Sequence, residues 1–345
     1  MQRRSEPAAA RRDLTLAGLL GKQQAITGAL LIALAVVPYF HTGYWLSQLT
    51  FVAIYAIAGF GLQILLGFAG QVSLGQAAFL ATGAYVCAYV ERIGLGSPAG
   101  FVAAVILSAG LGLLVALPAL RMSGLYLAVA TMSFGFIVEE IMARWTAVTG
   151  GNAGTVVPAI KLGGVTFGQP WQIYYLSWTF CFFVLLVCIN LLRTPTGRAM
   201  LAIRDSEIAA RSSGIRVPRV KGIAFGLSAA FAGLAGALYS HALGFISPDQ
   251  FTIAMSLDLL VMILIGGLGT LRGVLLGAVF LVVSPEIFQK LIGLVTSGNT
   301  EVTGLRPFLF GFSLIFILLF QPNGVDAIVA RIGQRLADLA NAWRR

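Results

Sequence analysis

The sequence predicts an all-α, polytopic membrane protein, a helical bundle whose chain crosses a lipid bilayer about ten times. Of its 345 residues, 58% are hydrophobic and 10% are charged, and the mean hydropathy is +0.89. Soluble domains carry about 25% charged residues. Apolar runs of the length needed to cross the hydrocarbon core, about 20 residues for a helix, recur along the chain. Runs such as Ala25–Phe40 lack the alternating pattern of a barrel strand, so helices are favoured.

Each apolar run is interpreted as one helix, and short polar or glycine-rich segments separate the runs. The predicted helices span residues 25–41, 44–66, 72–91, 98–119, 123–145, 171–192, 222–244, 256–270, 273–292 and 306–320. They divide the chain into a basic N-terminal segment (1–24), a transmembrane domain (25–322) and an amphipathic C-terminal tail (323–345).

The distribution of charge predicts the orientation of these helices. Loop 193–221 is rich in arginine and has Asp205 and Glu207 as its acidic residues, whereas Lys161 is the single charge of loop 146–170. Basic residues concentrate in cytoplasmic loops. We therefore expect both termini and loop 193–221 in the cytoplasm and loop 146–170 outside. The same bias accounts for the net charge of +10 without a nucleic-acid partner.

Loop 193–221 carries signals for two short helices. Thr194-Pro195 is typical of a helix start, and Asp205-Ser206 offers a second N-terminal cap. Glu207 and Arg211 have the spacing of an ion pair along a helix, and Gly214 suits a helix end. The pattern predicts a compact cytoplasmic knob; a basic loop that only sets the topology is the alternative.

The segment from Gly67 to Gln76 predicts an interrupted helix. Its glycines can break a helix, and the polar residues Gln71, Ser73 and Gln76 then begin the next apolar run. Exposed N-terminal amides at membrane depth favour an anionic group such as a carboxylate. This segment is a candidate for the translocation path. Alternatively, it is a glycine turn whose amides bond to neighbouring helices.

Three acidic residues, Glu139, Glu140 and Asp258, fall within or near predicted helices. Charge inside a membrane is costly, so Glu139 and Asp258 are candidates for the translocation path. At the membrane interface they would be ordinary.

We find no catalytic or metal-binding pattern. His41 and His241 are far apart near the outer ends of predicted helices, and the three cysteines, Cys87, Cys181 and Cys188, lie within apolar runs without paired spacing. Gly163–Gly168 has the glycine spacing of a phosphate loop, but Gln169 stands where lysine is needed. The sequence therefore predicts no enzyme activity, no metal site and no cofactor in this chain.

Motifs along nearly the whole chain resemble the LivM-type branched-chain amino acid ABC transporter permeases. They are Leu66–Phe79 (LGFAGQVSLGQAAF), Gly124–Thr131, Thr149–Gly151, Arg204–Gly214, Gly233–Tyr239, Gly266–Thr270 and Gln321–Gly324. The resemblance implies an importer permease in a bacterial plasma (inner) membrane, operating by alternating access. It implies a second homologous permease, two ATPases that bind ATP and Mg²⁺, and a periplasmic or extracellular amino-acid-binding protein.

The resemblance also implies that loop 193–221 docks on an ATPase. Glu207, Ala209, Ala210 and Gly214 are similar to the EAA-x3-G signature of importer permeases, although Ile208 places the glutamate one residue early. The docking residues it implies are Arg204, Asp205, Glu207, Ala209, Ala210, Arg211 and Gly214.

Other functions stay open at this point. Related permeases carry urea, short amides or aromatic acids. A secondary transporter would use Glu139, Glu140 and Asp258 to couple an ion gradient. A membrane enzyme is disfavoured because no nucleophile, base or metal cluster is evident.

Overall fold

The computed structural model describes residues 43–120, 122, 124–162 and 165–295, together with Gly311 and Gly324. The N-terminal segment and the predicted helix 25–41 lie outside these residues, as do the predicted helix 306–320 apart from Gly311 and the C-terminal tail apart from Gly324. The chain divides into two compact units, Met1–Leu46 and Ser47–Arg345, and the packing described below is that of the second unit.

Eight of the ten predicted helices fall on described residues, and all eight are helical. They are α2 (Tyr44–Leu62, continued by the π-helix η1, Gln63–Phe68), α3 (Gln76–Arg92), α4 (Ser97–Ala119), α5 (Leu125–Arg144), α7 (Pro170–Arg193), α10 (Val217–Leu243), α11 (Ile253–Gly266) and α12 (Leu271–Val295). Among the described residues, six helices are long and apolar enough to cross a membrane; α3 and α12 are not among those six.

Three predicted helix boundaries were wrong by several residues. Helix α3 begins at Gln76 instead of residue 72, because Gly70 has φ +67° and the chain to Gly75 is not helical. Helix α10 begins at Val217 instead of residue 222. Helix α11 ends at Gly266, because Gly267 and Gly269 have φ of +120° and +82°, which a right-handed helix does not accept.

The loop 146–170 is more structured than the prediction of an all-α protein allowed. It contains α6 (Thr146–Thr149), η2 (Gly151–Ala153), β1 (Thr155–Val156), β2 (Ile160–Leu162) and β3 (Val165–Phe167). Strand β2 pairs with β3, and β1 pairs with β4 (Phe245–Ile246), which follows α10 and precedes η3 (Pro248–Gln250). Because β1 and β4 are far apart in the sequence, their pairing was not evident from local patterns.

Helix α10 is the centre of the unit and packs on both α3 and α4. Glycines let the backbones meet: a Cβ at Gly83 would lie 2.0 Å from the carbonyl oxygen of Gly233, and one at Gly236 would lie 2.0 Å from that of Leu80. At Gly222 the nearest atom would be a leucine methyl group 4.0 Å away. Helix α10 thus makes its close backbone contact with α3 at Gly233 and Gly236.

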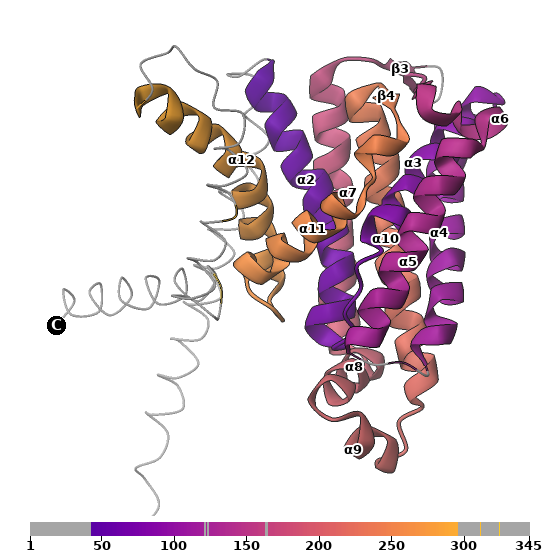
Figure 1. Cartoon of the computed structure of the whole chain (residues 1–345), viewed down its shortest axis with the longest axis vertical. Coiled ribbons are helices and arrows are strands. Elements are labelled where there is room, and N and C mark those ends of the chain that lie inside the picture. Colours follow the sequence, from indigo (N-terminus) through magenta and orange to yellow (C-terminus); the bar gives the residue numbers. More distant parts are fainter. Residues whose placement is uncertain are drawn as a thin grey trace, which may run out of the picture. The chain divides into compact units, whose positions relative to one another are not determined.

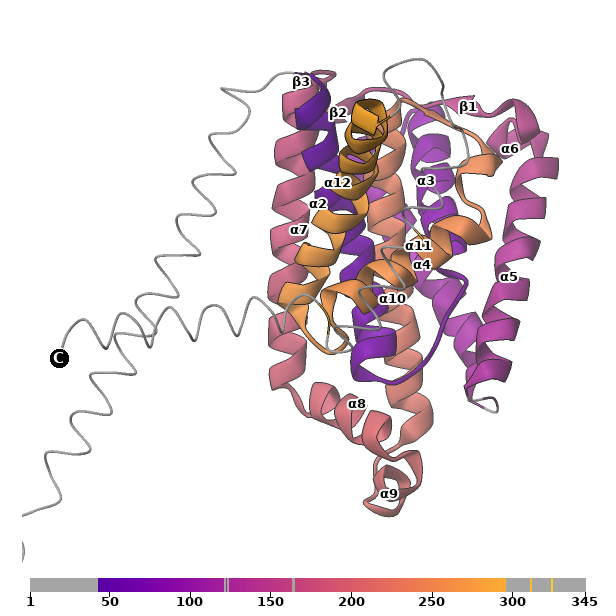
Figure 2. The same cartoon turned by 60° about the vertical axis from the view of Figure 1, so that its left-hand side comes forward.

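Two opposite ends of the unit carry different structures. Two short helices, α8 (Pro195–Asp205) and α9 (Glu207–Ser212), lie at one end, and α6 with strands β3 and β4 lies at the other (Figure 1). A view turned by 60° shows the same separation (Figure 2). We call these the knob end and the strand end, and we call α8 with α9 the knob.

Candidate functional site

The knob forms from local sequence signals. The Thr194 hydroxyl accepts a hydrogen bond from the Gly197 amide at 3.3 Å, and the Ser206 hydroxyl accepts one from the Ala209 amide at 3.3 Å. Each cap contributes about 1 kcal/mol to its helix. Gly214, with φ +81°, ends the second helix. The two predicted helices and their caps are therefore confirmed.

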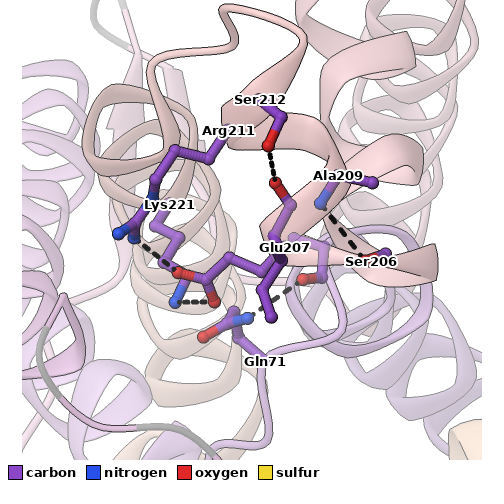
Figure 3. Close-up of polar contacts among 9 residues, drawn as sticks. Gln71, Ser206, Glu207, Ala209, Arg211, Ser212 and Lys221 are labelled. Atoms are coloured by element: carbon purple, nitrogen blue, oxygen red, sulfur yellow. Dashed lines mark hydrogen bonds and ion pairs between the residues drawn. The ribbon is translucent and has the colours of Figure 1, made fainter.

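The Glu207 carboxylate binds two basic side chains, those of Arg211 and Lys221 (Figure 3). Arg211 Nη2 donates to its Oε1 at 3.1 Å, which confirms the predicted ion pair, and Lys221 Nζ donates to its Oε2 at 2.9 Å. The Arg211 side chain is 67% exposed, whereas that of Lys221 is 2% exposed. Glu207 therefore holds α9 onto the start of α10 through a buried ammonium group.

Lys221 was not identified as a site residue from the sequence. It is the last residue of the predicted loop 193–221, but α10 begins at Val217 and includes it. Pro218 in the first turn of α10 is the local signal for this start. The burial of Lys221 depends on tertiary packing and has no such local signal.

The outward face of the knob combines apolar and charged groups. Ile208 is 82% exposed, one of the most exposed large hydrophobic residues in the described part of the chain. Asp205 and Ala209 are exposed beside it, whereas Ala210 is 3% exposed and packs inward. The exposed face of the knob therefore carries one large apolar side chain among charged and small residues.

Arg204 joins the knob to the interrupted helix. Its Nη1 donates to the carbonyl oxygen of Gly67 at 2.6 Å, and a Cβ at Gly269 would lie 3.0 Å from the same nitrogen. Gln63 in turn donates to the carbonyl oxygens of Gly267 and Thr270, both at 3.1 Å. The knob, the end of η1 and the turn after α11 thus meet at one guanidinium group.

The segment before α3 is buried and bonded to its surroundings. Gln71 donates to the carbonyl oxygen of Ala69 (3.1 Å), and the Ser73 hydroxyl accepts from the Gly75 amide (3.4 Å). Gln76, fully buried, forms 3.4 Å contacts with Ser228 of α10.

Backbone amides of this segment also have partners on other helices. The Leu74 amide donates to Thr131 of α5 and the Ala77 amide donates to Ser256 of α11, both at 2.9 Å. The segment therefore ties α3 to three other helices. In this conformation the Leu74 amide of the segment and the Ala77 amide in the first turn of α3 bond to neighbouring helices, as the alternative interpretation expected.

The acidic residues in helices lie in two different places. Glu139 lines a groove of about 910 Å³ at the strand end, with Trp145, Asn152 and Asp249, and Glu140 forms an ion pair with Arg144 at the same groove. Asp258 is exposed on α11, two residues after Ser256. The described structure does not bring Glu139, Asp258 and the knob together into one site.

Residues 44–318 match the protein family described as "Branched-chain amino acid transport system / permease component". The chain is 33% identical over 329 residues to "High-affinity branched-chain amino acid transport system permease protein LivM" of Salmonella typhimurium and 32% identical to LivM of Escherichia coli. Each alignment covers 88% of this chain and 75% of the relative. The chain is also similar to "Autoinducer 2 import system permease protein LsrC" of Photorhabdus laumondii. That alignment is 30% identical and covers 46% of this chain and 47% of the relative. No solved structure matches.

Proposed function

Since this chain belongs to the family of permease components of branched-chain amino acid transport systems, we propose that it forms the translocation path of an ATP-driven importer for leucine, isoleucine and valine. A second, homologous permease would complete this path. The observation that carries the proposal is the similarity to LivM over 88% of the chain. The capped knob also supports it, because an importer permease binds its ATPase through a knob of this kind.

The proposed orientation places the knob end in the cytoplasm of a bacterium, with the chain crossing the inner membrane about ten times and both termini inside. The arginine-rich segment 193–221 supports this, because basic residues favour the cytoplasmic side. The strand end, where Lys161 is the single charge of loop 146–170, then faces outward. An amino-acid-binding protein would deliver solute to that end.

The knob is the proposed docking site for the ATPase. Its outward residues Asp205, Ile208, Ala209 and Arg211 would contact the ATPase, and burying the Ile208 side chain there would contribute about 1.5–3 kcal/mol. Glu207, bonded to buried Lys221, would stabilise the knob and keep its shape while it is displaced. ATP and Mg²⁺ would bind to two partner ATPases.

Arg204 is the proposed route by which movement of the knob reaches the membrane domain. Its bond to the Gly67 carbonyl oxygen links α8 directly to the end of η1, next to the Gly267–Thr270 turn. Gly67 and Gly269 lie next to the guanidinium group, and neither has a side chain that could move and absorb a displacement of Arg204. ATP-driven closure of the ATPases would therefore shift η1 and the turn together and change the relative stability of the inward-open and outward-open states.

The translocation path is proposed to include Gln71, Ser73, Gln76, Glu139 and Asp258. The polar groups before α3 lie at the junction of several helices, and Asp258 is exposed although α11 is otherwise strongly apolar. A carboxylate facing lipid costs about 2.5–3.5 kcal/mol. Asp258 would therefore face water in the path or the second permease.

Co-purification tests the proposed function. The chain, isolated from its native membrane with its bound subunits, is expected to bring with it an ATPase and a second permease. ATP hydrolysis is then expected to rise when a leucine-loaded binding protein is added. Complexes without an ATPase would refute the mechanism, and uptake driven by an ion gradient alone would support a secondary transporter.

A panel of solutes tests the substrate separately. Stimulation by leucine, isoleucine and valine, with no response to urea, a short amide or phenylalanine, is expected. Stimulation by one of these other solutes alone would keep the importer but correct its substrate.

A further inference from the structure

A cysteine, a glutamate and a histidine meet near the strand end, away from the knob and the interrupted helix. Cys87 and Glu91 are one helical turn apart on α3, and His241 lies near the end of α10. Their side chains are deeply buried: those of Glu91 and His241 are 3% and 2% exposed, and Cys87 is 0% exposed. From the sequence, His241 was expected near an outer helix end and Cys87 was placed within an apolar run.

The packing of α3 on α10 brings these three groups together. The glycine contacts at Gly83 and Gly236 hold the two backbones close, so the next turns of each helix also face one another. Helix α4 covers the cluster: a Cβ at Gly100 would lie 3.0 Å from Cys87 Sγ, and the Phe101 ring lies 5.6 Å from the His241 ring. The cluster is therefore enclosed by three helices.

Three atoms converge with the spacing of metal ligands. The distances are 3.6 Å from Cys87 Sγ to His241 Nε2, 3.9 Å from Sγ to Glu91 Oε1, and 3.2 Å from Oε1 to Nε2. Tetrahedral Zn²⁺ with bonds of about 2.3 Å to sulfur and about 2.0–2.2 Å to nitrogen and oxygen places its ligand atoms about 3.3–3.7 Å apart. Shifts of a few tenths of an ångström would match that geometry.

The charge of the cluster and an unbonded atom both suit a divalent cation. The second carboxylate oxygen, Glu91 Oε2, is buried and has no hydrogen-bond partner among the described residues. A buried carboxylate oxygen without a partner destabilises a folded protein unless an ion or a water molecule binds to it. A thiolate and a carboxylate together neutralise the two charges of Zn²⁺, and a neutral imidazole completes a set of ligand types that zinc commonly has.

We propose that Cys87, Glu91 and His241 form a zinc site that joins α3 to α10 near the strand end. Three protein ligands leave one position for water or for Glu91 Oε2. Binding requires Cys87 to lose its thiol proton and His241 to be neutral, and these protons pass to solvent. The ion would fix the outer part of the α3–α10 contact. The proposal does not depend on the transport function.

Cobalt titration tests this site directly. The full chain, purified in detergent and stripped with a chelator, is expected to bind one equivalent of Co²⁺ with a thiolate-to-cobalt charge-transfer absorption, which Zn²⁺ then removes. Cys87→Ser is expected to abolish the absorption, and His241→Gln is expected to weaken binding at least about tenfold, since even groups that only support a ligand have effects of that size. Cys181→Ser, which changes a buried cysteine of α7, is the matched control and should leave the titration unchanged.

Thermal unfolding provides a second measurement. Zn²⁺ is expected to raise the Tm of the original chain and of Cys181→Ser but not that of Cys87→Ser. The serine variant is nearly isosteric, and its circular dichroism and elution volume would establish that it folds. No charge-transfer absorption in the original chain, or an absorption that survives Cys87→Ser, would overturn the proposal and leave a hydrogen-bonded cluster only.

Discussion

At the level of single residues, one buried charge, the Lys221 ammonium group, determines how the knob is held. Lys221 is 2% exposed and its ammonium group bonds to Glu207, which is 32% exposed and also bonds to Arg211. Removing one member of a fully buried pair costs about 3–5 kcal/mol because the other charge stays desolvated. The partial exposure of Glu207 lowers that cost, but the Lys221 side chain stays shielded from water.

The first prediction concerns this pair. Glu207→Ala is expected to lower the Tm of the purified chain, because it leaves the buried Lys221 ammonium group unpaired, and Lys221→Met in the same chain is expected to restore most of the loss. Arg219→Met, which removes an exposed charge from the same turn of α10, is the control and should change Tm little. Equal effects of Glu207→Ala and Arg219→Met would contradict a buried pair.

At the scale of elements, the knob connects the proposed docking surface to the interrupted helix. Helices α8 and α9 were predictable because their signals are local: Thr194 and Ser206 accept bonds from amides three residues away, and Gly214 has the positive φ of a helix end. The bond from Arg204 to Gly67 was not predictable, since 137 residues separate them. The same reason explains the missed pairing of β1 with β4.

The second prediction concerns Arg204. Arg204→Gln is expected to leave ATPase binding intact but to reduce leucine uptake per ATP hydrolysed by about tenfold or more, because its bond to the Gly67 carbonyl oxygen is lost. A tenfold change corresponds to about 1.4 kcal/mol of coupling, within the usual range for such links. Uptake and ATP hydrolysis are measured together in proteoliposomes that contain the whole complex.

Arg198→Gln provides the matched control for Arg204. Arg198 is also an exposed arginine of α8, but its guanidinium group bonds to the nearby carbonyl oxygen of Arg193. Its replacement should leave the ratio of uptake to hydrolysis unchanged. Equal ratios in the two variants would show that Arg204 does not transmit movement.

At the scale of the whole molecule, the described bundle is organised around α10, a helix rich in small residues between α3 and α4. Its apolar character and approximate span were predictable from hydropathy. Which glycines lie against the backbone of a neighbouring helix was not predictable. Gly222 and Gly226 have the spacing of a close-packed pair, but the backbones that come close belong to Gly233, against α4, and Gly236, against α3. Rotation of the helix decides between them.

The third prediction tests this packing. Gly236→Ala places a Cβ 2.0 Å from the Leu80 carbonyl oxygen, so the helices must separate, and a loss of about 1–3 kcal/mol in the free energy of unfolding is expected. Gly222→Ala, with its nearest neighbour 4.0 Å away, should have little effect. Denaturant unfolding in detergent measures both. Comparable stability of the two variants would contradict the described contact between α3 and α10.

Photocrosslinking at the tip of the knob tests whether the knob binds an ATPase. A photoreactive amino acid replaces Ile208, which is 82% exposed, and in a second variant it replaces Ile93, which is 53% exposed and follows α3 at the strand end. Irradiation of intact membranes is expected to attach the ATP-binding subunit to position 208 and not to position 93. Attachment of that subunit to position 93, or of the binding protein to position 208, would show that the ATPase does not dock on the knob.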